Sequence, residues 1–139
     1  MKILIVGSTS FYDRIEEIRK ILEERNNEVI MPNCYENPVT NEDNKKMTEE
    51  EYVSFFKDMY YESRNKIKEV DAILVLNYDK NKEGREYKNY VGASTFLEMY
   101  EAFMQNKKIF MLNGLPDNIL YDEIKGFNPV IINNDLNKI

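Results

Sequence analysis

The chain has 139 residues, a formal net charge of −6, one cysteine and no histidine. This length predicts a single domain, residues 1–139, and the lone Cys34 excludes an internal disulfide and a cysteine-based zinc site. The acidic balance argues against nucleic acid as a partner, and no apolar run is long enough for a signal peptide or a membrane span, so we expect a cytoplasmic protein.

The N-terminal third predicts a strand, a polar loop and a helix. Lys2–Val6 is an aliphatic run of strand length, and residues 11–26 carry apolar side chains at helical spacing. The loop between them, Gly7-Ser8-Thr9-Ser10, could hold a phosphate or sugar oxygens at the helix N-terminus. The alternative is structural, with Ser10 or Asp13 serving only as the helix cap.

The middle of the chain predicts a short strand, a loop and a long helix. The strand covers residues 28–31, and residues 33–44 show no periodic pattern, so we interpret them as a long loop over the site. Thr48 and Glu51 form a capping box that opens a helix ending near residue 70. The aromatic side chains of this helix favour core packing or a subunit contact over a base-stacking surface.

The second half predicts a strand, a crossover helix and another strand. Residues 71–76 and 107–112 are apolar runs without alternation, which is typical of strands buried on both faces. A charged insertion, residues 77–88, follows the first of them. A short helix over residues 118–125 and an edge strand over residues 129–132 complete the chain. The elements predict an α/β fold, a flavodoxin-like three-layer sandwich with a five-stranded parallel sheet in the order 2-1-3-4-5.

The segment between the two buried strands, residues 89–102, is the centre of the predicted site. Ligands of such sheets bind at the carboxyl ends of the strands, and Glu98 would lie at that rim, in the first turn of a helix. The positive end of the helix dipole would favour its ionised form. The competing interpretation is a second capping box, with Thr95 as the N-cap and Glu98 reaching back to it.

These residues resemble the nucleoside 2-deoxyribosyltransferase superfamily. The resemblance is carried by the strand that opens with Asp71, the Val91-Gly92 turn, the Glu98-Met99 pair and the strand that follows Gln105. The Gly7-Ser8-Thr9 loop is similar to that of the superfamily's nucleoside 5′-monophosphate N-glycosidase branch.

The resemblance implies an enzyme that cleaves or transfers the N-glycosidic bond of a (deoxy)nucleoside or its 5′-monophosphate. Glu98 would be the nucleophile and Asp71 an assisting acid or a positioning group; Asp71 could equally be a turn residue that closes the preceding helix. The expected substrate contacts are Gly7, Ser8, Thr9 and Ser94 for ribose or phosphate and Tyr78 or Phe11 beside the base. Asn89 and Gly92 are expected substrate contacts as well.

Two further functions remain open at this stage. Asn89-Tyr90 stands where the transferases have an acidic residue, so the chain could be a non-catalytic module that binds a nucleotide in the same cleft. An enzyme that cleaves NAD is suggested by architecture alone. In each case we expect a small-molecule nucleoside or nucleotide partner, no metal or organic cofactor, and a homodimer or higher homo-oligomer.

Overall fold

Five strands form one parallel sheet in a computed structural model that describes all 139 residues. The sheet strands are β1 (Lys2–Gly7), β2 (Glu28–Ile30), β3 (Ala72–Leu76), β6 (Lys108–Met111) and β7 (Val130–Ile131). Their order is β2-β1-β3-β6-β7 and every pairing is parallel. This is the predicted order 2-1-3-4-5, so the predicted α/β sandwich is confirmed.

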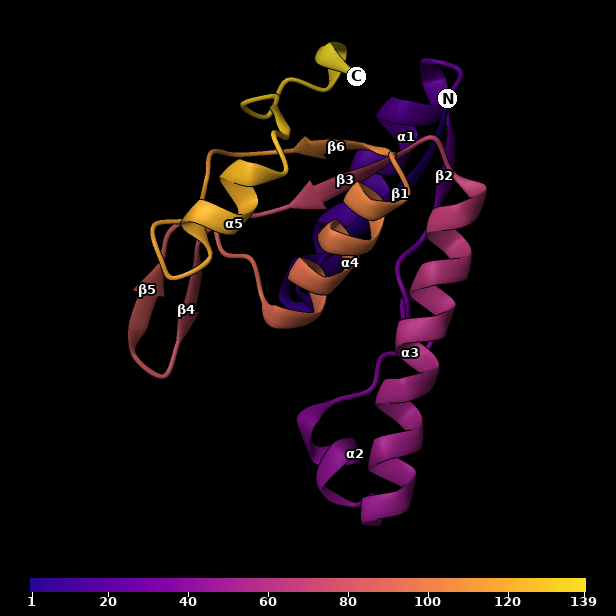
Figure 1. Ribbon diagram of the computed structural model, residues 1–139, viewed down its shortest axis with the longest axis vertical. Helices are drawn as coiled ribbons and strands as arrows, with labels where there is room; N and C mark the ends of the chain where they lie inside the picture. Colours follow the sequence, from indigo (N-terminus) through magenta and orange to yellow (C-terminus); the bar gives the residue numbers. More distant parts are fainter.

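Helices cover both faces of this sheet (Figure 1). They are α1 (Ile15–Glu24), α2 (Asn41–Lys45), α3 (Glu49–Glu69), α4 (Ala93–Met104) and α5 (Tyr121–Gly126), with short 3-10 helices η1 (Thr9–Arg14) and η2 (Leu136–Lys138). None of the helices combines the length and the apolar character that crossing a membrane requires.

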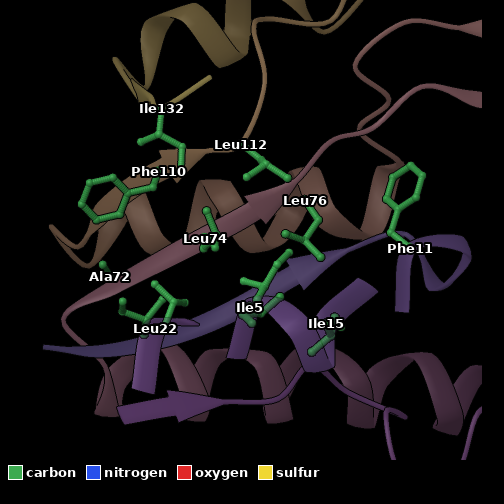
Figure 2. Packing of buried hydrophobic residues seen from close by; sticks show 12 residues of the cluster. Ile5, Phe11, Ile15, Leu22, Ala72, Leu74, Leu76, Phe110, Leu112 and Ile132 are labelled. Atoms are coloured by element: carbon green, nitrogen blue, oxygen red, sulfur yellow. The ribbon is translucent and has the colours of Figure 1, made fainter. Parts of the chain in front are cut away.

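The two faces of the sheet bury two separate apolar clusters. On one face, Ile3 and Ile5 of β1 pack with Ile15 and Leu22 of α1, and Figure 2 shows the buried residues of this cluster. On the other face, the alternate side chains of β1 and β3 pack against α3, α4 and α5. Each fully buried aliphatic side chain contributes on the order of 2 kcal/mol, so the two clusters hold the helices to the sheet.

The helix α3 continues well beyond the sheet (Figure 1). It begins where the sequence predicts, because the expected capping box forms. The backbone N–H of Glu51 donates to the Thr48 hydroxyl, and the backbone N–H of Thr48 donates to the Glu51 carboxylate. Its only buried side chains are Ser63 and Ile67. Core packing of its aromatic side chains is therefore wrong, and the alternative of a subunit contact stays a prediction.

Three local predictions need correction. The helix expected over residues 11–26 is α1 preceded by η1, and Ser8 caps η1 rather than Ser10 or Asp13. The stretch 33–44 includes most of α2, which begins with a second capping box formed by Thr40 and Asp43. The charged insertion between β3 and α4 is an antiparallel hairpin of β4 (Lys80–Lys82) and β5 (Arg85–Tyr87), which projects from the carboxyl end of β3 (Figure 1).

Candidate functional site

A cavity of about 860 Å³ opens beside the carboxyl end of β1, between the segment that follows β2, one side of α3 and the start of α4. This volume lies within the range of small-molecule sites. Its wall includes Gly7, Ser8, Thr9, Tyr12, Asn33, Cys34, Asn44, Phe55, Phe56, Met59, Tyr60, Tyr61, Ser63, Arg64, Tyr90, Gly92, Ser94, Thr95, Glu98 and Glu101. The cavity therefore brings together Glu98, the Gly7-Ser8-Thr9 loop, Gly92 and Ser94, as predicted from the sequence.

Glu98 occupies the second turn of α4 on the cavity wall. The helix begins after Gly92, which is its N-cap, so Thr95 is a buried helical residue and the predicted Thr95–Glu98 capping box does not form. The Ser63 hydroxyl of α3 donates a hydrogen bond to Glu98 Oε2 at 3.0 Å. The side chain of Glu98 is half-buried, and its other oxygen makes no protein hydrogen bond.

The surroundings of Glu98 favour its protonated form more than the sequence suggests. Burial raises its pKa from the ordinary 4.5 to about 7, although the Ser63 hydrogen bond and the positive charge of Lys66 act in the opposite direction. The expected effect of the helix dipole does not prevail. The field of the dipole is strongest in the first turn of the helix, and Glu98 lies in the second. A carboxyl with this pKa is about half ionised at neutral pH.

Tyr12 of η1 is a cavity residue that the sequence did not identify. Its hydroxyl donates a hydrogen bond to the backbone oxygen of Asn33 at 2.9 Å. Burial raises the pKa of Tyr12 well above its usual value, and the nearby charge of Glu98 raises it further. Tyr12 is therefore a neutral hydroxyl at physiological pH and a fixed part of the cavity wall.

The Gly7-Ser8-Thr9 loop meets a lysine from the hairpin. A Cβ on Gly7 would lie 2.9 Å from the backbone oxygen of Leu76, so only glycine allows β1 to approach β3 this closely. Lys80 of β4 places its Nζ 3.0 Å from Ser8 Oγ and 4.7 Å from the centre of the Tyr90 ring. Lys80 makes no ion pair, and burial lowers the pKa of its ammonium group.

Asp71 lies away from the cavity, which corrects its predicted catalytic role. It precedes β3, at the amino end of the sheet, where its Oδ2 accepts a hydrogen bond from the backbone N–H of Lys2 at 2.7 Å. The cavity opens at the opposite, carboxyl end. Asp71 therefore ties the start of β1 to the start of β3, which is a structural role.

Three predicted substrate contacts also lie outside the cavity wall. Phe11 is buried in the core and packs edge-on against Tyr78 with ring centres 5.3 Å apart, so these two rings contact each other. The guanidinium of Arg14 covers the Tyr78 ring at 4.2 Å. Asn89 adopts a positive φ of 51° in the turn before α4, where its backbone N–H donates to Asp79. Its role is to shape that turn.

No group of three or more histidine, cysteine or acidic side chains is arranged to hold a metal ion. Sequence reasoning missed three residues of the cavity wall, Tyr12, Asn33 and Ser63. It also missed Lys80, which lies outside the wall and contacts Ser8 from the hairpin. Asn33 and Lys80 gave a usable signal, because each belongs to a segment that follows a strand, at the edge of the sheet where ligands bind.

No family model matches the sequence, and no curated protein matches it. Among solved structures, the CMP N-glycosidase BcmB of Clostridium botulinum aligns with 97% of this chain and 90% of its own, at 20% identity and a TM-score of 0.52. The 2-deoxyribosyltransferase of Bacillus psychrosaccharolyticus aligns with 88% of this chain and 81% of its own, at 15% identity and a TM-score of 0.51. The chain therefore has the fold that this N-glycosidase and this deoxyribosyltransferase share, which confirms the resemblance at the level of the fold.

Proposed function

We propose that the protein cleaves or transfers the N-glycosidic bond of a nucleoside 5′-monophosphate, with Glu98 as the nucleophile. One observation carries the proposal: the Glu98 carboxyl lies on the wall of a cavity large enough for a nucleotide, with one oxygen held by Ser63 and the other free of protein partners. The likeness to an N-glycosidase and a deoxyribosyltransferase supports the same reaction class.

The chemistry follows from the position of the carboxylate. Glu98 attacks C1′ of the sugar on the face opposite the base, while the C1′–N bond breaks and its electrons leave with the base nitrogen, which takes up a proton from water. This step forms a glycosyl ester on Glu98. Water, or the nitrogen of a second base, then attacks C1′, the bond between C1′ and the Glu98 oxygen breaks, and Glu98 leaves as a carboxylate. The attacking group gives its proton to the hydroxide that the first step left.

A 5′-phosphate is favoured by the surroundings of Lys80. A partly buried ammonium group without an acidic partner is unfavourable unless an anion compensates its charge. Ser8, whose hydroxyl lies 3.0 Å from Lys80 Nζ, belongs to the cavity wall together with Thr9. A phosphate monoester supplies the oxygens that this ammonium, these hydroxyls and the loop N–H groups would bind.

The test is chromatographic detection of free base after incubation with a panel of nucleosides and their 5′-monophosphates, with and without an acceptor base. We expect release from a monophosphate by the wild-type protein, none by Glu98→Gln, and wild-type-like release by Asp71→Asn. Activity in Glu98→Gln would contradict the proposed nucleophile. Ligand binding without base release would instead favour the non-catalytic module, and a rise in melting temperature would detect it.

We also propose a homo-oligomer. Four apolar side chains of α4, namely Leu97, Tyr100, Phe103 and Met104, are 44 to 57% exposed and lie close together on one stretch of the helix. Such a patch on a small chain is typical of a subunit contact. Light scattering that gives the mass of one chain at micromolar concentration would contradict this.

A further inference from the structure

Glu98 is the last member of a chain of hydrogen bonds that begins outside α4. The Nδ2 group of Asn33, in the segment after β2, donates to Ser63 Oγ at 2.7 Å, and Ser63 Oγ donates to Glu98 Oε2 at 3.0 Å. The same Nδ2 group also donates to the backbone oxygen of Met59 at 3.2 Å. All three side chains line the cavity, and Ser63 is only 7% exposed.

The hydrogen bonds from Asn33 through Ser63 to Glu98 have a defined direction. The Asn33 amide is oriented because its nitrogen faces two oxygens that can accept hydrogen bonds, and one of these, the Met59 backbone carbonyl, can only accept. Ser63 has a single hydroxyl hydrogen. Since its oxygen already accepts from Asn33, that hydrogen is directed at Glu98. Glu98 Oε2 is therefore matched to a donor, which favours the carboxylate over the carboxylic acid.

The segment that carries Asn33 is held in place independently. Tyr12 donates to the Asn33 backbone oxygen at 2.9 Å, and Lys66 Nζ donates to the Met31 backbone oxygen at 3.1 Å. These contacts join η1, the segment after β2 and α3 on one side of the cavity. The donor that faces Glu98 thus belongs to a preorganised part of the wall, as an active-site carboxylate requires.

We propose that Asn33 and Ser63 are positioning residues, which fix Glu98 Oε2 so that Oε1 faces the anomeric carbon and which keep the carboxyl in its nucleophilic form. This inference rests on the proposed function and assigns to it two residues from outside α4. The ionisable groups that face Glu98 are Lys66 of α3, whose charge lowers the pKa of Glu98, and the neutral Tyr12 of η1; Cys34 lies near Tyr12 and raises its pKa.

The first experiment measures kcat and KM across pH for Ser63→Ala and Ser63→Thr. We expect Ser63→Ala to lower kcat at pH 7 by roughly tenfold, the value of one hydrogen bond to a charged group, and to leave KM nearly unchanged. The acid limb of its pH profile should move to higher pH. Ser63→Thr keeps the hydroxyl and should restore both properties. Loss of activity by one constant factor at every pH would overturn the proposal.

Asn33→Asp tests the direction of these hydrogen bonds at nearly constant side-chain volume. An aspartate cannot donate to Ser63 and would attract the hydroxyl hydrogen away from Glu98, so the acid limb should move further than in Ser63→Ala. Wild-type behaviour of this variant would also overturn the proposal.

A direct titration separates this inference from the proposed function. The ¹³C signal of the Glu98 carboxyl, assigned by its loss in Glu98→Gln, can be followed against pH in the wild-type protein and in Ser63→Ala. A higher midpoint in Ser63→Ala supports the positioning role even if no substrate on the panel releases its base. Identical midpoints overturn it even if the enzyme is active.

Discussion

Replacing Glu98 by glutamine should change the stability of the protein in a pH-dependent way, whatever the substrate is. A carboxyl whose pKa is higher in the folded protein than in the unfolded chain binds its proton more tightly when folded. Glu98 therefore favours folding at low pH, and this contribution is lost as the pH rises from the ordinary value of 4.5 through about 7. Glutamine has no proton to lose and retains one side-chain oxygen that can accept from Ser63.

The size of the effect follows from the displacement of the pKa. A change from 4.5 to about 7 corresponds to about 3 kcal/mol of stability lost between pH 4 and pH 8. This figure is an upper limit, because Glu98 is half-buried and water in the cavity reduces the penalty. Glu98→Gln should thus be more stable than the wild-type protein at pH 8 by up to about 3 kcal/mol, or on the order of 10 °C in Tm, and close to it at pH 4.5.

The assay is urea unfolding of both proteins from pH 4.5 to pH 8.5. The quantity of interest is the difference between the two unfolding free energies, because the titration of every other group is common to both proteins and cancels. This difference should grow in favour of Glu98→Gln with a midpoint between pH 5 and 7. Two parallel pH curves would refute the reasoning, because they would mean that the carboxyl of Glu98 titrates in the folded protein as it does in the unfolded chain.

The remaining predictions concern Lys80, Gly7 and Thr48. Lys80→Ala should lower kcat/KM for a 5′-monophosphate by about 10- to 100-fold and leave that for the nucleoside unchanged. Lys82→Ala, at the exposed end of β4, should affect neither. Equal losses on both substrates in Lys80→Ala would exclude a phosphate contact. Gly7→Ala should lower the unfolding free energy by about 2 kcal/mol because of the contact with Leu76, whereas Gly126→Ala, where no atom lies within 4 Å, should change it by less than about 1 kcal/mol. Thr48→Ala should lower the melting temperature through the loss of about 1 kcal/mol of capping energy, and Thr48→Ser should restore it. An unchanged melting temperature in Thr48→Ala would show that tertiary contacts, not the cap, hold the start of α3.

The sheet was predictable because its strands are short apolar runs in the expected sequence. β1, β3 and β6 are buried on both faces, so their sequences show the continuous pattern that such strands need. The capping box of Thr48 and Glu51 depends only on local sequence, and the structure confirms it. The hairpin β4–β5 was missed because its strands are charged and pair only with each other, so they show no burial pattern.

The site was predictable only where it depends on local sequence. Glu98 and the Gly7-Ser8-Thr9 loop follow strands or open helices, so topology alone brings them to one edge. Ser63 and Asn33 were missed because their role depends on where the middle of a long helix passes the sheet, which periodicity does not determine. Asp71 was misassigned because a residue before a strand lies at the amino end of a parallel sheet, opposite the ligands.

The hairpin that carries Lys80 has a consequence for how this fold can change its substrate. It projects from the carboxyl end of β3 and forms a two-stranded sheet of its own, so its residues take no part in the five-stranded sheet (Figure 1). Loops of this kind tolerate changes in length at small cost in stability. A chimera in which residues 80–87 are exchanged for a shorter turn, so that Asp79 still accepts from the Asn89 backbone N–H, should therefore fold normally and keep Glu98 in place while it loses the charge that faces Ser8. Preference for a phosphorylated substrate would then be a property of one detachable segment, separate from the bond-breaking residue.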